Sequence, residues 1–144
     1  ANLRSPTFYP KRFHSLVLRR INRNLPGARD CGAVDGHHVT VEHILPRKPA
    51  KGADWWRVFP NQQTVTSHRN RLGNLAFLSL EDNQAVNNQD FKVKLAVLRR
   101  SADRFALTGH AVSYDTWTPE VIMQRTEALI GILFAQWDLA VDPA

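Results

Sequence analysis

The sequence contains a single cysteine, Cys31, in 144 residues. One thiol excludes an internal disulfide and a structural zinc site built from cysteines. Long apolar runs are also missing, because the longest one, residues 128–135, is too short to cross a bilayer. The N-terminal region has no secretory pattern of basic start, apolar run and small-residue cleavage site. We therefore expect no structural zinc, no association with a membrane and a reducing, cytoplasmic location.

Acidic residues are scarce in the first part of the chain, which makes the overall charge of +6 uneven. Residues 1–51 hold ten Lys and Arg against three acids, and residues 52–101 hold seven against four. Residues 102–144 reverse the balance, with two basic residues against six acids. The positive charge thus lies where a polyanionic partner such as nucleic acid would bind, although a solubility charge without a partner would look similar.

Helical patterns mark both ends of the chain. Between residues 11 and 24, apolar side chains recur at a spacing that predicts one stripe of an amphipathic helix: Phe13, Leu16, Val17 and Ile21. Residues 90–101 show near-helical spacing, and Thr118-Pro119-Glu120 combines an N-cap, a first-turn proline and a first-turn acid. We expect a long bracing helix after Thr118, and irregular structure over residues 101–116 and in the basic stretch after Pro46.

The stretch from Val39 to Pro46 contains the residues that point to chemistry. Residues 39–42 alternate apolar and polar side chains, which predicts a short half-buried strand, and Pro46 cannot continue the ladder. Just before that stop, Glu42 and His43 supply a hard metal ligand and a proton acceptor, the minimum for metal-assisted hydrolysis. Because neighbours on a regular strand point to opposite faces, a shared site requires the strand to twist or bend at its Pro46 end.

A second strand is predicted over residues 73–79, after a Gly-Asn turn element. The pattern Ser79-x-x-Asp82 then predicts the start of a short helix. This places Asn83 at the end of the first turn, with Asn87 one turn later on the same face.

Phosphodiester cleavage requires a nucleophilic water, neutralisation of charge on the phosphate and help for the leaving oxygen. His43 is neutral above an ordinary pKa of about 6.5 and can take the proton of the water. Glu42 and Asn83 offer oxygen ligands for Mg²⁺ or another divalent cation such as Mn²⁺, which is often held by one or two protein groups plus substrate phosphate. Asn87 and Asp82 are alternatives to Asn83 as the second ligand.

Basic residues follow both strand regions, and we expect them to position DNA phosphates without reading sequence. The candidates are Arg47, Lys48, Lys51, Arg69 and Arg71. Among the histidines, His68 could supplement the site or be an exposed loop residue, and His37 and His38 are interpreted as polar turn residues. Of the adjacent Trp55 and Trp56, which could stack bases, we expect at least one to be core.

The order of strand, basic connection, strand and helix resembles the ββα-metal finger of the HNH nucleases, with the signature E-H-I-x-P and a nine-residue step from Asn74 to Asn83. Three longer stretches extend the resemblance: V-T-V-E-H-I-L-P, R-L-G-N-L-A-F-L-S-L-E-D-N and N-N-Q-D-F-K-V-K. With the ending W-T-P-E-V-I-M-Q-R, they are similar to the C-terminal HNH domain of GmrSD-type modification-dependent restriction systems, including the SspE type. The resemblance covers nearly the whole chain, and the first thirty residues are the least diagnostic.

The resemblance implies an α+β fold, mostly helical, built around a short two-stranded antiparallel sheet. Residues 1–144 would form one HNH nuclease domain, with a helical extension over 1–30, a ββα finger over 37–90 and C-terminal helices over 91–138. Asn74 would pin the loop and orient His43 instead of contacting the metal. The chain would be the C-terminal fragment of a bacterial protein whose N-terminal sensor domain hydrolyses nucleotides.

The expected function is that of a Mg²⁺-dependent HNH endonuclease that nicks double-stranded DNA with low sequence specificity. It would be the effector of a modification-sensing restriction system that defends against phage. Two alternatives remain. One is a non-catalytic DNA-binding module on the same scaffold, and the other is a bacteriocin-type DNase.

Overall fold

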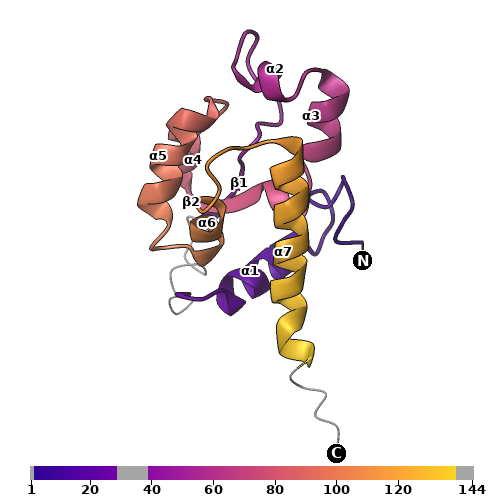
Figure 1. Cartoon of the computed structure of the whole chain (residues 1–144). Coiled ribbons are helices and arrows are strands. Elements are labelled where there is room, and N and C mark those ends of the chain that lie inside the picture. Colours follow the sequence, from indigo (N-terminus) through magenta and orange to yellow (C-terminus); the bar gives the residue numbers. More distant parts are fainter. Residues whose placement is uncertain (1, 29–38, 139–144) are drawn as a thin grey trace, which may run out of the picture.

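The computed structural model describes residues 2–28 and 39–138, with the side chains of 136–138 left out. Figure 1 shows two short strands in the middle of the molecule with helices packed around them and α7 running along one face. His37, His38 and Cys31 lie outside the described residues. The elements in chain order are α1 (His14–Asn24), β1 (Val39–His43), α2 (Trp55–Val58), α3 (Gln62–His68), the 3₁₀ turn η2 (Leu72–Asn74), β2 (Leu75–Ser79), α4 (Leu80–Val86), α5 (Phe91–Ser101), α6 (Ala106–Ala111) and α7 (Pro119–Asp138).

The sheet consists of β1 and β2, which pair antiparallel from Val39 opposite Ser79 to His43 opposite Leu75. The pairing stays regular through His43, and the chain bends immediately afterwards, at residues 44–45. The predicted strand stop before Pro46 is therefore confirmed. The bend follows the last residue of the strand.

Helix α4 begins directly after β2, because Ser79 caps it by accepting a hydrogen bond from the Asp82 backbone N–H at 3.1 Å. The sequence β1–β2–α4 is thus a strand–strand–helix unit, with helices before and after it. At the start of α7, the hydroxyl of Thr118 accepts from the Val121 backbone N–H at 3.1 Å, as expected from the capping pattern. The predicted α+β class, mostly helical around a two-stranded antiparallel sheet, is confirmed.

Three helices were not predicted from the sequence: α2 and α3, in the connection between the two strands, and α6, within residues 101–116, where irregular structure was expected. All three are short, and each buries apolar side chains against the rest of the fold, including Trp55 and Val65. Trp55 is thus a core residue, as expected for one of the two tryptophans. Helices this short are marginal in isolation, so tertiary packing decides them and a local pattern cannot.

The apolar stripe predicted for α1 is wrong at one position. Leu16 is 72% exposed, whereas Leu18 and Ile21 are fully buried. Leu18 and Ile21 are one helical turn apart and face the core, and Leu16 lies off that face. Within the described part of the chain, no helix is long and apolar enough to span a membrane.

Helix α7 packs closely against η2, just before β2. A Cβ atom added to Gly73 would lie 2.0 Å from the Ile122 carbonyl oxygen, so only glycine fits there. The Gly73 backbone N–H also donates to Thr126 Oγ1 at 3.0 Å. This contact fixes the start of β2, and therefore the position of Asn74, relative to the longest helix.

Candidate functional site

A pocket of about 510 Å³ lies beside the end of β1. Its walls come from β1 and the bend after it, from residue 69 between α3 and η2, and from the C-terminal part of α4 with the residues that follow it. The lining residues are Val41, Glu42, His43, Pro46, Arg47, Lys48, Arg69, Asn83, Asn87 and Asn88. The structure thus brings together Glu42, His43 and two of the candidate ligand amides, from segments forty residues apart in sequence.

His43 lies at the pocket with only 9% of its surface exposed. Its Nε2 is 3.1 Å from Asn70 Oδ1, and because a carbonyl oxygen only accepts, Nε2 carries the proton and Nδ1 remains a free acceptor. The Tyr9 ring packs nearly perpendicular to the imidazole, with 4.4 Å between ring centroids. Burial, opposed by the Asn70 hydrogen bond and assisted by nearby Arg47, lowers the pKa of His43 to about 4. The ring is therefore a neutral, oriented base at physiological pH.

Glu42 contacts a different neighbour. Its Oε1 accepts a hydrogen bond from Nζ of Lys94 on α5, and both side chains are almost fully buried. Lys94 Nζ also donates to the His43 backbone carbonyl at 2.9 Å. Burial raises the pKa of Glu42, and the positive charge of Lys94 opposes that rise. Glu42 and His43 therefore leave the strand toward different partners, as neighbours on a strand do. Both still border the pocket, which lies beside the bend at residues 44–45.

The amide of Asn83 is held in one orientation. Its Nδ2 donates to Thr40 Oγ1 at 2.8 Å and more weakly to the Val41 carbonyl at 3.3 Å. No described residue donates to Oδ1, so this oxygen is available to a ligand in the pocket. Asn87 caps the end of α4 with φ 35°, a strained conformation for a non-glycine residue, and strain of this kind is concentrated at functional sites.

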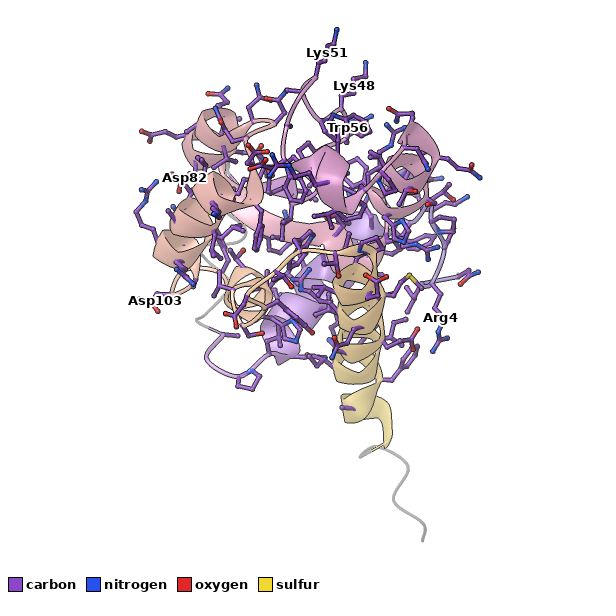
Figure 2. The ribbon with its side chains drawn as sticks, turned by 45° about the horizontal axis from the view of Figure 1, so that its top comes forward. Arg4, Lys48, Lys51, Trp56, Asp82 and Asp103 are labelled. Carbon is purple, nitrogen blue, oxygen red and sulfur yellow. The ribbon has the colours of Figure 1, made fainter. Side chains whose placement is uncertain are left out.

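Asp82, the other alternative ligand, does not line the pocket. Its carboxylate accepts from Arg100 Nη2 at 2.9 Å and from Ser101 Oγ at 3.2 Å, both on α5. Figure 2 shows Asp82 on the flank of the molecule, away from the end where Lys48 and Lys51 project. Its oxygens stabilise the packing of α4 on α5, and this position favours Asn83 or Asn87 as the ligand.

Asn74 is fully buried and connects the bend after β1 to the start of β2. Its Oδ1 accepts from the Leu45 backbone N–H at 2.8 Å and from Trp117 Nε1 at 2.9 Å. Its Nδ2 donates to the carbonyls of Leu45 at 3.0 Å and Arg69 at 2.8 Å. Asn74 thus holds the loop that borders the pocket, whereas the His43 ring donates its hydrogen bond to Asn70.

Three of the five candidate phosphate-binding residues line the pocket: Arg47, Lys48 and Arg69. Arg69 Nη1 donates to the Arg47 carbonyl at 2.7 Å, while Arg69 Nε is buried without a hydrogen-bond partner among the described residues. Lys51 lies outside the pocket and projects into solvent in Figure 2. Arg71 is also outside, since its guanidinium donates to the backbone carbonyls of Ser67 and Arg4, each at 2.7 Å.

Sequence reasoning missed three residues at this site: Tyr9, Asn70 and Lys94. Only Lys94 had a local signal, because it lies three residues after Phe91 and four before Leu98, within the apolar stripe of its helix. His68 was left open, and the structure places it outside the pocket with Nδ1 bonded to the Thr64 carbonyl of its own helix at 2.8 Å.

The donor set fits an oxygen-liganded cation. Glu42 has a second carboxylate oxygen, Oε2, and Asn83 Oδ1 and the Asn87 amide border the same pocket. Oxygen ligands of this kind suit Mg²⁺ or Mn²⁺. Among the described residues, no group of three or more His, Cys, Asp or Glu side chains could form an all-protein cage. Any cation held here would therefore need water or substrate oxygens to complete its coordination.

Comparison with known proteins gives one match. A family model described as "GmrSD restriction endonucleases, C-terminal domain" matches residues 1–132 of the chain. Neither a curated protein nor a solved structure matches the chain. The match covers both strands, the pocket and most of α7.

Proposed function

The chain belongs to the family of C-terminal domains of GmrSD restriction endonucleases, and from that premise we propose that it is an HNH-type endonuclease domain that nicks DNA with the help of a divalent cation. His43 is the general base. Mg²⁺ is the expected cation, with Mn²⁺ as a substitute. In the full-length protein, an N-terminal sensor domain directs this activity to foreign DNA.

The observation that carries the proposal is the state of His43. A general base must be unprotonated at the working pH and must present a free nitrogen to water. Burial keeps the ring neutral, and the hydrogen bond from Nε2 to Asn70 leaves Nδ1 free. Tyr9 packs against the imidazole and limits its movement. These contacts support Nδ1 as the atom that takes the proton of the attacking water.

The rest of the pocket supports phosphodiester hydrolysis. Arg47, Lys48 and Arg69 bind and orient the phosphate, because they place three positive charges around the pocket. Glu42 and Asn83 would hold the divalent cation, which when bound supplies neutralisation of the charge that develops on the phosphate and the leaving oxygen. With the phosphate and the cation bound by these other residues, the role of His43 is to accept the proton of the attacking water.

Low sequence specificity follows from the same contacts. Lys and Arg side chains that bind phosphates fix the position of the protein on DNA, but they do not recognise the nucleobases. The pocket contains one catalytic general base, His43, so a monomer cleaves one DNA strand per encounter. A double-strand break then needs two nicks or two domains. Selection of the target is then left to the sensor domain.

The test is the conversion of supercoiled plasmid to open circles by the purified domain with Mg²⁺. We expect nicking by the wild type, none with EDTA, and a loss of about 10²- to 10⁴-fold for His43→Ala, the range of a general base. His68→Ala is the matched control, because that histidine lies outside the pocket and bonds within its own helix. It should nick at the wild-type rate.

Other outcomes would redirect the assignment. Nicking that survives His43→Ala would show that another group is the base. Plasmid left intact under all conditions, but shifted on a gel by both proteins, would favour a DNA-binding module without catalysis.

A further inference from the structure

Lys94 is fully buried, and the sequence gives it no role beyond its place on a helix. It extends from α5 to the end of β1, where Nζ donates to Glu42 Oε1 and to the His43 carbonyl oxygen. The two acceptors belong to the adjacent residues that border the pocket. A single ammonium group thus ties the carboxylate side chain of one to the backbone of the other.

A buried ammonium is costly, and a buried ion pair is often no more stabilising than apolar residues of the same volume. Packing of α5 alone therefore does not explain a lysine at this position. The contact has two consequences for the pocket instead. It fixes the rotamer of Glu42, and it occupies only Oε1, so that Oε2 is left without a donor among the described residues.

The second consequence is electrostatic. Glu42 is the only carboxylate that lines the pocket in the described part of the chain, and with Lys94 it forms a unit of zero net charge. Arg47, Lys48 and Arg69 remain around it and make the pocket positive. A positive pocket attracts a phosphate and repels a divalent cation. A bound phosphate would reverse that balance and add oxygen ligands.

We propose that Lys94 is a positioning residue that orients and neutralises Glu42, so that a divalent cation binds this pocket only together with a DNA phosphate. The inference rests on the proposed function of the pocket and adds an order of binding to it. The free domain holds the cation weakly. DNA completes the site, and activation of water is thereby confined to the moment when a phosphodiester is in place.

Direct binding of Mn²⁺, followed by the electron paramagnetic resonance signal of the free ion, tests the proposal without relying on cleavage. The titrations use His43→Ala protein, which is expected to leave the DNA intact, with and without a short DNA duplex, and a DNA-only titration is subtracted. We expect the duplex to tighten Mn²⁺ binding at least tenfold. Equal affinity in both titrations would overturn the proposal.

Substitution of Lys94 tests whether this residue causes the dependence of Mn²⁺ binding on DNA. Added to the same background, Lys94→Met should tighten Mn²⁺ binding to the DNA-free domain at least tenfold, because it removes the positive charge that contacts Glu42 and repels a bound cation, and should shrink the effect of DNA. Lys92→Met is the matched control on the same helix, where the side chain is exposed, and it should change neither value. An unchanged Mn²⁺ affinity in folded Lys94→Met would overturn the role of Lys94.

Two further measurements keep the result interpretable. If Lys94→Met does not fold, the double variant Glu42→Gln/Lys94→Met removes both charges of the pair. It should bind no Mn²⁺, with or without DNA. Retained Mn²⁺ binding would contradict the role of Glu42. Failure of the wild type to nick plasmid would refute the proposed function by itself. Normal nicking combined with DNA-independent Mn²⁺ binding would refute only this inference.

Discussion

Two regions of the molecule each combine a buried cationic side chain with a neutral histidine, and they use them differently. We call them the pocket region and the brace region. The pocket region consists of Glu42, His43, Asn70 and Lys94, and the brace region consists of Gly73, His110, Arg125 and Thr126. In the pocket region the buried cation contacts a carboxylate that borders an open pocket. In the brace region the buried cation contacts backbone carbonyls in the interior.

Arg125 illustrates the second arrangement. Its Nη1 donates to the carbonyls of Gly73 and Leu75, both at 2.8 Å, and its Nη2 donates to Leu107 at 2.9 Å. Its Nε donates to His110 Nδ1 at 3.3 Å. Burial lowers the pKa of Arg125 to about 9, so the guanidinium stays charged at neutral pH. Each of these acceptors is used within the fold, and none is left for a ligand.

The difference shows that a buried charge by itself does not mark a site. Arg125 satisfies carbonyls where α6, α7 and the start of β2 meet, which stabilises the fold. Lys94 holds a carboxylate that keeps one oxygen free at a pocket. Substitutions in the brace region should therefore reduce stability and leave nicking per folded molecule intact, whereas substitutions in the pocket region should reduce nicking per folded molecule.

Arg125→Met should have the largest effect on stability. It removes the guanidinium that donates to three buried carbonyls, at a cost of about 3–5 kcal/mol in the free energy of unfolding. Urea denaturation measures the loss, with Arg57→Met as the exposed control, for which a change of less than about 0.5 kcal/mol is expected. If the folded fraction of Arg125→Met nicks DNA far more slowly than the wild type, the separation of the two regions is wrong.

Gly73→Ala should cost about 3 kcal/mol, because the added Cβ would meet backbone atoms of α7 that cannot move away easily. Gly131→Ala is the matched control on α7, where nothing lies within 4 Å of the new Cβ. That variant should gain up to about 1 kcal/mol from helix propensity. Thermal and urea unfolding of both proteins would decide the point, and equal effects would mean that the contact between η2 and α7 is loose.

Acidification should destabilise both regions together. Burial lowers the pKa of both His43 and His110 to about 4, so the unfolded chain binds more protons than the folded one between pH 6.5 and 4. The contribution of the two neutral histidines to the free energy of unfolding is fully present above pH 6.5 and is lost as the pH is lowered. Each histidine should account for a loss of about 1 kcal/mol between pH 7.5 and 5.5. Urea unfolding at the two pH values measures this loss.

Variants of the two histidines separate the regions. His43→Gln and His110→Gln should each remove about half of that pH dependence, and only His43→Gln should abolish nicking. In the wild type, kcat/KM should show no inflection near pH 6.5, since the base is already neutral there. An inflection near pH 6.5 in the wild-type profile would contradict this and mean that the imidazole is solvated.

The smallest effect is expected for single phosphate contacts. Lys48→Gln should weaken DNA binding about three- to tenfold and lower the slope of log affinity against log salt by about one. Lys51→Gln should have less effect, since Lys51 does not line the pocket. Arg104→Gln should have no effect, since Arg104 does not line the pocket and its guanidinium lies over the Phe105 ring. Fluorescence anisotropy over a range of salt concentrations measures DNA binding by the three variants. Equal slopes of log affinity against log salt would show that the pocket is not the DNA-binding surface.

The sequence by itself determined the elements whose signals are local. Alternation and Pro46 set β1, the Ser79 pattern set the start of α4, and Thr118-Pro119-Glu120 set the start of α7. The residues Glu42, His43 and Asn83 were also found this way, and the structure brings them to one pocket. Their chemical roles remain predictions.

Only the tertiary structure decided which other groups complete the site. The hydrogen bond from His43 to Asn70 joins residues 27 positions apart, and Lys94 reaches Glu42 across 52 positions. Tertiary contacts also decided that Asp82, Lys51 and Arg71 lie outside the pocket, and that the short helices α2, α3 and α6 form. Each depends on contacts between segments far apart in sequence. A pattern of neighbouring residues carries no information about such contacts.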